Sequence, residues 1–295
     1  MKIGIDLGGT KTEGILIDNE GKELIKTRIK TQKNYQGTID GIISVVSEFE
    51  KNFGEVDSVG IGMPGAISEG SALIKNSNSI WLNGKPLKKD LENQLQRKVN
   101  LENDANCFAL SEAVDGAGKG HSVVFGVILG TGVGGGIIIN QKILQGRNKI
   151  SGEWGHITLP NRTEDEKKYN KKCYCKKEGC METYVSGPGF ASIYNLRHNA
   201  NLDSHEIINE YPGDQKSLVA LKNYVDHLAR GLSVVINILD PEIIVLGGGM
   251  SNVDYIYTNI NEQLKQYVFT DTCHTKVVKN IHGDSGGVRG AAWLS

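Results

Sequence analysis

Hydrophobic residues alternate with short glycine-rich turns both at the start and in the middle of the chain. Residues 2–29 predict three strands, joined first by a glycine-rich turn and then by a hairpin turn at 18–21. Residues 122–145 repeat this plan, with the hairpin turn at 140–141. Two copies of one supersecondary unit predict two similar lobes that face each other. A ligand held by both glycine turns would then lie in the cleft between the lobes.

The rest of the chain alternates strands with helices. Apolar residues recur at helical spacing over 38–53 and 218–239, and the second helix is expected to stop at Pro241. A buried strand over 243–246 runs into three glycines, and Ser251 is the predicted N-cap of the next helix. This alternation is typical of the α/β class.

Charge and composition exclude several classes of protein. The 295 residues include 33 basic and 34 acidic side chains, so the formal net charge of −1 lacks the basic surplus of a nucleic-acid binder. No apolar stretch approaches the roughly 20 residues that a membrane helix needs. The chain begins directly in strand-like sequence, without an apolar signal segment, so we expect a cytoplasmic protein.

The first glycine-rich turn could approach an anion. It comprises Gly8, Gly9, Thr10 and Lys11, where backbone N–H groups and a hydroxyl can donate to phosphate. Asp6, at the end of the preceding strand, could hold Mg²⁺ through water on a bound polyphosphate. A tight hairpin with no ligand remains the alternative for this turn.

Two later glycine clusters extend the same interpretation. Residues 130–136 contain a formal G-x-G-x-x-G match, but the sequence that follows is β-branched and strand-like. A dinucleotide-binding fingerprint must open a helix, so that interpretation is rejected. A phosphate cradle at Thr131-Gly132 survives, and Gly247-Gly248 follow another strand. Together the turns make a nucleoside triphosphate the best candidate ligand.

Two short motifs carry groups suited to catalysis and sugar recognition. Asp104 lies at a strand-to-helix junction, where it could accept a proton from a substrate hydroxyl or simply cap the helix. The motif GEWGH places Glu153 and His156 three residues apart. Such a pair can satisfy sugar hydroxyls, although a surface pair without a ligand is the more common cause of this spacing.

Three of the five cysteines crowd into eight positions. Cys173, Cys175 and Cys180, with His156 upstream, complete the donor set of a tetrahedral structural Zn²⁺ site. Three inert reduced thiols are the alternative. The polar segment 161–172 that leads into this loop is predicted to be a solvated excursion. Cys107 and Cys273 are isolated and are expected to be ordinary small side chains.

Taken together, these motifs resemble the ROK family of sugar kinases, within the actin-like/hexokinase superfamily of ATPases. The resemblance covers essentially the whole chain, and its most specific part is GEWGH at 152–156 followed by C-x-C-x₄-C and Glu182. Lys176 stands where the family pattern has a glycine, while the ligand spacing is intact. Within the family, the segments at 75–87, 101–117 and 239–254 are most similar to bacterial fructokinases.

The resemblance implies a fold and its division. The implied fold is a two-lobed, ribonuclease H-like α/β architecture, with duplicated βββαβα-type lobes and an interlobe cleft. The N-terminal lobe would span 1–117, with 284–295 returning to it. The C-terminal lobe would span 118–283 and carry the zinc loop. The family also suggests a homodimer, and charge and apolar patterning predict that it contacts neither nucleic acid nor membrane.

The resemblance also implies a role for each matching residue. Asp104 matches the catalytic base. The remaining matches are the sugar-binding residues Gly65, Asn78, Asn103, Glu153, His156 and Glu182, the ATP cradle at Gly8, Gly9, Thr10, Lys11, Thr131, Gly132, Gly247 and Gly248, and the zinc ligands His156, Cys173, Cys175 and Cys180. The cofactors expected are ATP, Mg²⁺ and structural Zn²⁺.

The implied reaction is transfer of phosphate from ATP to the primary hydroxyl of a hexose, with fructose as the expected acceptor and fructose 6-phosphate as the product. Glucokinase and kinases of N-acetylglucosamine or N-acetylmannosamine are the alternatives, because they share the same sugar-binding residues. An inactive sugar sensor should lack the base, yet Asp104 is present. A repressor of the family would need a DNA-binding segment before the first strand, which is expected at residue 2.

Overall fold

The computed structural model describes residues 1–295 and divides them into two compact units. Unit 1 comprises Met1–Gly120, Gln141–Ser151 and Ile281–Ser295. Unit 2 comprises His121–Asn140 and Gly152–Asn280. The segment Gln141–Ser151 therefore groups with unit 1, whereas the predicted division assigned it to the C-terminal lobe.

Unit 1 is built on a five-stranded sheet with the order β3-β2-β1-β4-β7. Its strands are β1 (Lys2–Leu7), β2 (Lys11–Ile17), β3 (Glu23–Lys30), β4 (Ser58–Met63) and β7 (Lys98–Asn103). The first three pair antiparallel, as a meander, and β4 and β7 pair in parallel with β1 and with each other. A two-stranded ribbon, β5 (Ala66–Ile67) and β6 (Ile74–Lys75), follows β4.

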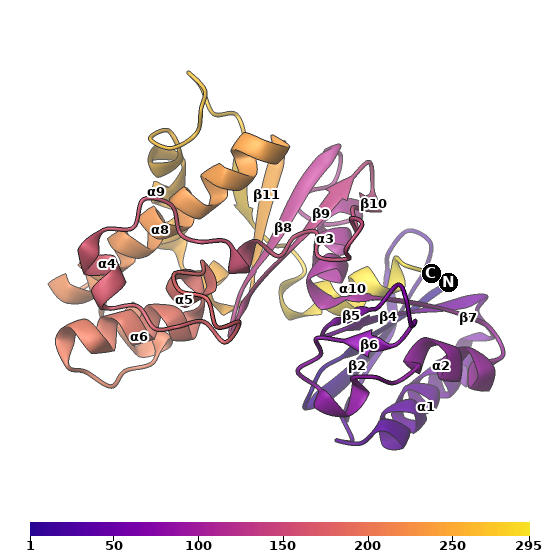
Figure 1. The fold of residues 1–295 in the computed structure, drawn as a ribbon. Coiled ribbons are helices and arrows are strands. Elements are labelled where there is room, and N and C mark those ends of the chain that lie inside the picture. Colours follow the sequence, from indigo (N-terminus) through magenta and orange to yellow (C-terminus); the bar gives the residue numbers. More distant parts are fainter. The chain divides into compact units, whose positions relative to one another are not determined.

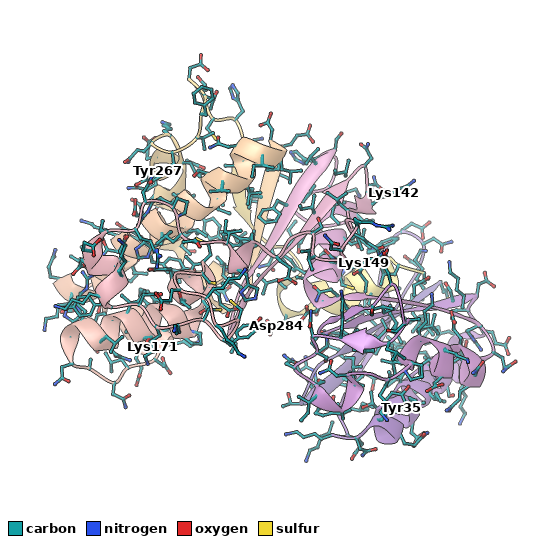
Figure 2. The ribbon with its side chains drawn as sticks, viewed as in Figure 1. Tyr35, Lys142, Lys149, Lys171, Tyr267 and Asp284 are labelled. Atoms are coloured by element: carbon teal, nitrogen blue, oxygen red, sulfur yellow. The ribbon has the colours of Figure 1, made fainter.

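Helices cover both faces of this sheet (Figure 1). They are α1 (Tyr35–Phe53), α2 (Leu87–Leu95), α3 (Asp104–Val114) and α10 (Gly286–Ala292), with short 3₁₀ turns η1 (Ile80–Leu82) and η4 (Gly283–Ser285). Side chains alternate along β2: Leu16 packs into the core with α1 and α2, whereas Ile15 and Ile17 pack with α10. The hydroxyl of Tyr35 donates to Asp90 at 2.6 Å, which ties α1 to α2 (Figure 2).

A glycine on β4 lets α10 approach the sheet closely. A Cβ atom at Gly60 would lie 1.8 Å from the carbonyl oxygen of Ala291, so no larger residue fits there. The C-terminal helix thus belongs to the core of unit 1 although it is almost 230 residues away from β4 in sequence (286 − 58 = 228).

Unit 2 repeats the plan of unit 1. The second sheet has the order β10-β9-β8-β11-β12, with strands β8 (Val123–Leu129), β9 (Val133–Ile139), β10 (Lys142–Ile143), β11 (Ile243–Gly247) and β12 (Lys276–Lys279). All of these strands belong to unit 2 except β10, which lies in the segment that groups with unit 1. As in unit 1, an antiparallel hairpin is followed by two strands added in parallel. The duplicated α/β unit predicted from the sequence is confirmed.

The helices of unit 2 surround an independent hydrophobic core. They are α4 (Glu164–Lys168), α5 (Glu182–Val185), α6 (Gly187–His198), α7 (Ser204–Glu210), α8 (Gln215–Leu239) and α9 (Asp254–Leu264), with 3₁₀ turns η2 (Trp154–His156) and η3 (Gly249–Asn252). Leu221, Leu228 and Leu232 of α8 are buried in this core, as the helical spacing predicted. No helix is both long enough and apolar enough to cross a bilayer.

The predicted N-cap at Ser251 is wrong. Helix α9 begins at Asp254, and its N-cap is Val253. Ser251 lies inside η3, where its hydroxyl donates to the carbonyl of Gly248 at 2.7 Å. The glycine-rich strand end continues into a 3₁₀ turn before the helix starts, so the serine closes that turn instead.

Candidate active site

The β1–β2 turn of unit 1 has the geometry expected of an exposed glycine cradle. Gly8 N–H donates to the carbonyl of Lys11 at 3.0 Å, and the Thr31 hydroxyl donates to the carbonyl of Gly8 at 2.8 Å. A Cβ atom at Gly8 would lie 2.8 Å from the Lys11 carbonyl oxygen, so this tight turn requires glycine. Thr10 and Lys11 are exposed, which leaves their donors available to an anion.

Asp6 stands at the end of β1 beside other carboxylates. It lies opposite Glu13 on the neighbouring strand, and it is partly buried. Burial first, and then the negative charges of Asp104 and Glu13, raise the pKa of Asp6 to about 6, although Lys11 lowers it. A carboxylate in this environment gains from a bound cation, which fits the predicted Mg²⁺ role.

Asp104 is the first residue of α3 and is exposed. The N-cap of this helix is Asn103, whose Oδ1 accepts from the Ala105 N–H at 2.9 Å. Asp104 Oδ1 accepts from the same N–H at 2.9 Å. Capping of this helix by Asn103 therefore does not depend on Asp104.

Two other predicted sugar-binding residues of unit 1, Asn103 and Gly65, meet at the end of β7. Asn103 Nδ2 donates to the carbonyl of Gly65 at 3.2 Å, which brings these two residues together. Gly65 has a φ of +91°, and a Cβ atom there would lie 2.5 Å from the Lys75 carbonyl oxygen. Asn78 is exposed.

In unit 2, the GEWGH segment is clamped onto β9 by its central residues. Trp154 is buried, and its indole N–H donates to the Gly134 carbonyl at 2.9 Å. A Cβ atom at Gly155 would lie 2.3 Å from the Val133 carbonyl oxygen, so glycine is required for this approach. The buried tryptophan thereby fixes Glu153, which is exposed, and His156, which is partly exposed, on either side of it.

Glu182 lies between Cys173, a predicted zinc ligand, and the β8–β9 turn. It begins α5, and its Oε2 accepts from the Val133 N–H at 3.2 Å. Its Oε1 lies 3.7 Å from the Sγ of Cys173. A Cβ atom at Gly132 would lie 3.0 Å from Oε2. A predicted sugar ligand and the predicted nucleotide turn are therefore in direct contact.

The two predicted nucleotide turns of unit 2 lie at the ends of adjacent parallel strands. Gly247 ends β11 and pairs with Ile128 of β8, two residues before the turn at Gly130. In that turn, Gly130 N–H donates to the Gly132 carbonyl at 3.0 Å and Thr131 is exposed. Gly248 has a φ of +81° and touches the backbone of Leu129. The structure thus brings Thr131-Gly132 and Gly247-Gly248 together.

The four predicted zinc ligands converge in unit 2. Their ligand atoms all lie within 4.8 Å of one another, with Cys173 Sγ 3.6 Å from His156 Nδ1 and Cys175 Sγ 3.5 Å from Cys180 Sγ. A tetrahedral site with Zn–S bonds of about 2.3 Å separates its ligands by roughly 3.7 Å. The donor set and its spacing therefore fit Zn²⁺, bound through the Nδ1 atom of His156.

The turn between the cysteines forms despite the substitution at its centre. Lys176 has a φ of +70°, and its N–H donates to the Cys173 carbonyl at 2.9 Å. Lysine therefore adopts the left-handed conformation that glycine would adopt more easily. Burial, and then the neighbouring Cys175, raise the pKa of Cys180 to about 12; a bound metal favours the thiolate and opposes this rise.

Tyr174 is a site residue that the sequence did not indicate. Its hydroxyl lies 2.9 Å from Nε2 of His156, and the two rings meet edge to face. Partial burial of the hydroxyl, and then the charges of Glu182 and Glu153, raise the pKa of Tyr174 to about 12. The only signal for it was a large aromatic residue between two cysteines predicted to bind metal, a position for which spacing rules set no requirement.

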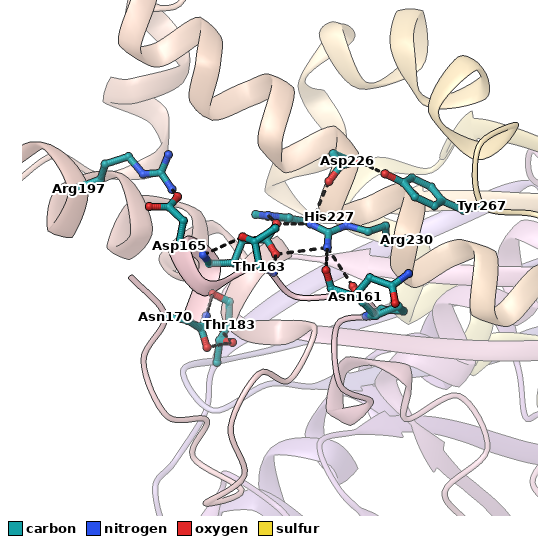
Figure 3. Close-up of polar contacts among 12 residues, drawn as sticks. Asn161, Thr163, Asp165, Asn170, Thr183, Arg197, Asp226, His227, Arg230 and Tyr267 are labelled. Atoms are coloured by element: carbon teal, nitrogen blue, oxygen red, sulfur yellow. Dashed lines mark hydrogen bonds and ion pairs between the residues drawn. The ribbon is translucent and has the colours of Figure 1, made fainter. Parts of the chain in front are cut away.

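The excursion before the cysteines is anchored rather than fully solvated. It contains α4, where Thr163 and Glu166 form a reciprocal capping box. Glu166 also bonds His227, at 3.0 Å, and Arg230, both buried on α8; Arg230 in turn contacts Asp226 at 2.9 Å (Figure 3). Burial alone would raise the pKa of Glu166, but these hydrogen bonds hold it well below its ordinary value. The prediction of a purely solvated segment is wrong at Glu166.

A cavity of about 250 Å³ lies among α4, α6 and α8 of unit 2. Its walls include the rings of Phe190, Tyr194 and Tyr224. Asp165 and Arg197, which also line it, form an ion pair with each other. None of the predicted site residues lines this cavity, so it is separate from the candidate active site.

Comparison with known proteins decides the family. The family model described as "ROK family" matches residues 2–295. The chain belongs to the ROK family. The predicted membership, as a sugar kinase of this family, is confirmed. N-acetyl-D-glucosamine kinases are its similar relatives: that of Escherichia coli O127:H6 is 39% identical over 100% of this chain and 99% of its own. The N-acetyl-D-glucosamine kinase of Pectobacterium atrosepticum is 40% identical over 100% of this chain and 98% of its own.

Solved structures agree with the ROK fold. A ROK hexokinase from Thermus thermophilus has a TM-score of 0.89 at 27% identity, over 100% of this chain and 98% of that one. A ROK glucokinase from Streptomyces griseus, solved with glucose and AMPPNP, has a TM-score of 0.79 at 28% identity over the same shares. The predicted fold class, the two-lobed sugar-kinase type, is confirmed. The relatives named are N-acetylglucosamine kinases, so the alternative reading is better supported than fructokinase.

Proposed function

We propose that this ROK sugar kinase transfers the γ-phosphate of ATP to the primary hydroxyl of N-acetyl-D-glucosamine, giving N-acetyl-D-glucosamine 6-phosphate and ADP. The observation that carries this choice of sugar is 39–40% identity, over the whole chain, to N-acetyl-D-glucosamine kinases. The ROK hexokinase and glucokinase are 27–28% identical. Fructose, glucose and N-acetylmannosamine are the competing acceptors.

The proposed base is Asp104. It takes the proton of the sugar 6-hydroxyl as that oxygen forms its bond to the γ-phosphorus, and the bond from the γ-phosphorus to the β–γ bridging oxygen breaks, releasing ADP. An exposed carboxylate at a helix start that is already capped by Asn103 suits this role.

The sugar hydroxyls are assigned to six residues, of which Gly65 offers only its backbone. Gly65, Asn78 and Asn103 come from unit 1, and Glu153, His156 and Glu182 come from unit 2. Charged acceptors and a ring N–H donor leave no buried sugar hydroxyl unpaired, and each unpaired hydroxyl would cost about 1–3 kcal/mol. The clamped GEWGH segment supports this assignment, because it orients Glu153 and His156 before any sugar binds.

The phosphates of ATP are assigned to the glycine turns at Gly8–Lys11, Thr131-Gly132 and Gly247-Gly248. Their tight backbone geometry supports close approach to an anion. Asp6 would hold Mg²⁺, which, when bound, neutralises charge on the transferring phosphoryl group. His156, Cys173, Cys175 and Cys180 would hold a structural Zn²⁺ that fixes the loop bearing His156.

The cytosolic location and the homodimer stay predictions. Sedimentation at a monomer mass would contradict the homodimer.

The test is ADP release by the purified protein with N-acetylglucosamine, N-acetylmannosamine, glucose, mannose and fructose in parallel. We expect the highest kcat/KM for N-acetylglucosamine. A preference for fructose would contradict the proposed sugar while leaving the kinase chemistry in place. Turnover with no sugar, in protein replete with zinc and magnesium, would contradict the proposed function itself.

Asp104→Asn separates chemistry from binding in the same assay. Because a general base contributes roughly 10²–10⁴ in rate, we expect kcat to fall by about that factor while the Kd for the sugar changes little. Asp57→Asn, at an exposed carboxylate elsewhere in unit 1, is the matched control. Near-wild-type turnover of the Asp104 variant would rule out its assignment as the base.

A further inference from the structure

Both ring nitrogens of His156 have partners within unit 2. Nδ1 faces the Sγ of Cys173 at 3.6 Å, on the side where the thiols converge. Nε2 faces the hydroxyl of Tyr174 at 2.9 Å. The rings of His156 and Tyr174 meet edge to face, with centroids 5.2 Å apart and an interplanar angle of 80°. The phenol of Tyr174 is thus hydrogen-bonded to Nε2 of His156, the ring nitrogen that would bond a sugar hydroxyl in the proposed function.

The protonation of the imidazole decides the direction of this hydrogen bond. A neutral imidazole that binds a metal through Nδ1 must carry its proton on Nε2. Nε2–H then donates, and the phenol oxygen of Tyr174 accepts. A sugar hydroxyl oxygen would accept from the same N–H, so the tyrosine oxygen is the chemical equivalent of a sugar hydroxyl at this position. The negative charges of Glu182 and Glu153 raise the pKa of the same phenol, which keeps it protonated.

Tyr174 can move aside at small cost. Its side chain is 77% exposed, and its hydroxyl makes no hydrogen bond besides that to His156. Its backbone is held between Cys173 and Cys175, so displacement requires only rotation of the side chain. A buried tyrosine such as Tyr224, whose hydroxyl donates to Val185 at 2.9 Å, has no such freedom.

We propose that Tyr174 is a gate of the sugar site: its hydroxyl accepts from His156 Nε2 in the sugar-free protein and gives way to a hydroxyl of the incoming sugar. This inference rests on the proposed function, because it takes His156 as a sugar ligand. The gate makes sugar binding a competition. A sugar must supply a hydroxyl that bonds His156 at least as well as the phenol does, and an analogue that lacks this hydroxyl leaves the gate closed.

The test compares Tyr174→Phe with the wild-type protein. The variant keeps the ring and its packing against His156 but removes the competing oxygen. Because the net strength of one hydrogen bond corresponds to roughly 2–10-fold in an equilibrium constant, we expect the Kd and KM for N-acetylglucosamine to fall by about that factor. The KM for ATP and kcat should not change. Calorimetry without nucleotide measures the Kd directly.

Controls separate the gate from a structural effect. Tyr169→Phe, on the same excursion but away from the zinc ligands, should leave every constant unchanged. Tyr174→Leu removes the ring as well and should also lower the Kd, and zinc analysis checks that both variants keep the metal. An unchanged Kd would overturn the gate, and a higher Kd would overturn it in favour of a direct sugar contact by the phenol. If the wild-type enzyme phosphorylates no hexose, the proposed function fails, whereas an unchanged Kd in an active enzyme counts against the gate alone.

Discussion

Two single residues of this protein occupy states that are unfavourable in isolation, and both lie in the candidate site. Lys176 has a φ of +70°, in the region that costs a non-glycine residue roughly 1–2 kcal/mol. Asp6 must ionise near other carboxylates. Strain of this kind persists where the surrounding structure or a ligand compensates for it. For Lys176 the compensation proposed is the metal loop, and for Asp6 it is the bound cation.

The raised pKa of Asp6 predicts that Asp6→Asn stabilises the protein. A folded-state pKa of about 6, against 3.8 for an unperturbed carboxyl, means that folding opposes ionisation. Stability is therefore lost as the pH rises from about 4 through about 6. At pH 8 we expect the variant to unfold with a free energy higher by about 1–3 kcal/mol, and at pH 4 with nearly the wild-type value.

Urea denaturation at both pH values measures this difference. Asp57→Asn, at an exposed carboxyl group, should show no pH-dependent gain. The Asp6 variant should also lose most of its kinase activity, since it lacks the proposed Mg²⁺ ligand. A variant that is less stable than the wild type at pH 8 would show that Asp6 is not penalised by ionisation.

At the scale of elements, the short helix α4 connects the zinc loop to the core of unit 2. Glu166 is the connecting residue, because it completes the capping box of α4 and pairs with His227 and Arg230 of α8 (Figure 3). A helix of five residues is not stable by itself. Its position therefore depends on this buried pairing, which a polar and charged segment of sequence does not reveal.

We expect Glu166→Gln to destabilise the protein. The amide cannot pair with Arg230, which is 4% exposed, and breaking a buried pair costs up to about 3–5 kcal/mol. Because the pKa of Glu166 is lowered in the folded state, this stability is present above its unfolded value and is lost as the pH falls. The difference between variant and wild type should therefore shrink below about pH 4.

Chemical denaturation at pH 7 and at about pH 3 checks this expectation. Glu164→Gln is the matched control, since Glu164 lies on the same helix but pairs only with exposed Lys167. Equal effects of the two substitutions would contradict a special role for Glu166. A zinc assay of the variant shows whether the loop beyond α4 is disturbed as well.

The pattern of elements was largely predictable from local sequence, and the boundaries were less so. Helix α8 and the hairpin turn at Asn140-Gln141 follow from spacing and turn chemistry; both turn residues have positive φ. The cap of α9 was predicted wrongly, because Ser251 bonds to Gly248 within a 3₁₀ turn that no hydrophobic period marks. Local chemistry determines which groups can cap, but not which backbone group they meet.

At the scale of the whole molecule, the chain consists of two units, each with its own hydrophobic core. The predicted zinc ligands all belong to unit 2. Metal binding to a folded site stabilises the unit that forms the site and leaves the other unit without direct gain. Bound metal is therefore expected to raise the free energy of unfolding of unit 2 and to leave that of unit 1 nearly unchanged.

We expect removal of zinc by a chelator to lower the melting temperature of unit 2 selectively. A loss of several kcal/mol corresponds to a shift of roughly 10 °C or more for a unit of this size. Scanning calorimetry should then show two transitions, with the lower one restored by added Zn²⁺. Cys173→Ser should behave like the chelated protein, and Cys273→Ser should not. A uniform shift, or none, together with far less than one Zn²⁺ per chain, would contradict the structural zinc site.

The sequence by itself determined the α/β class, the duplicated unit and the positions of the glycine turns, and it predicted the four side chains that converge as a candidate zinc site. These features follow from short-range pattern: hydrophobic period, glycine where backbones approach, and ligand types at fixed spacing. Only the tertiary structure decided that Glu182 contacts the turn at Gly132, that Glu166 is anchored by α8, and that the hydroxyl of Tyr174 bonds Nε2 of His156. Each of these joins residues whose side chains meet only after folding, and neither hydrophobic period nor ligand spacing encodes such a contact. The choice of hexose did not follow from the sequence, because the predicted sugar-binding residues Glu153, His156 and Glu182 are expected in all the competing hexose kinases.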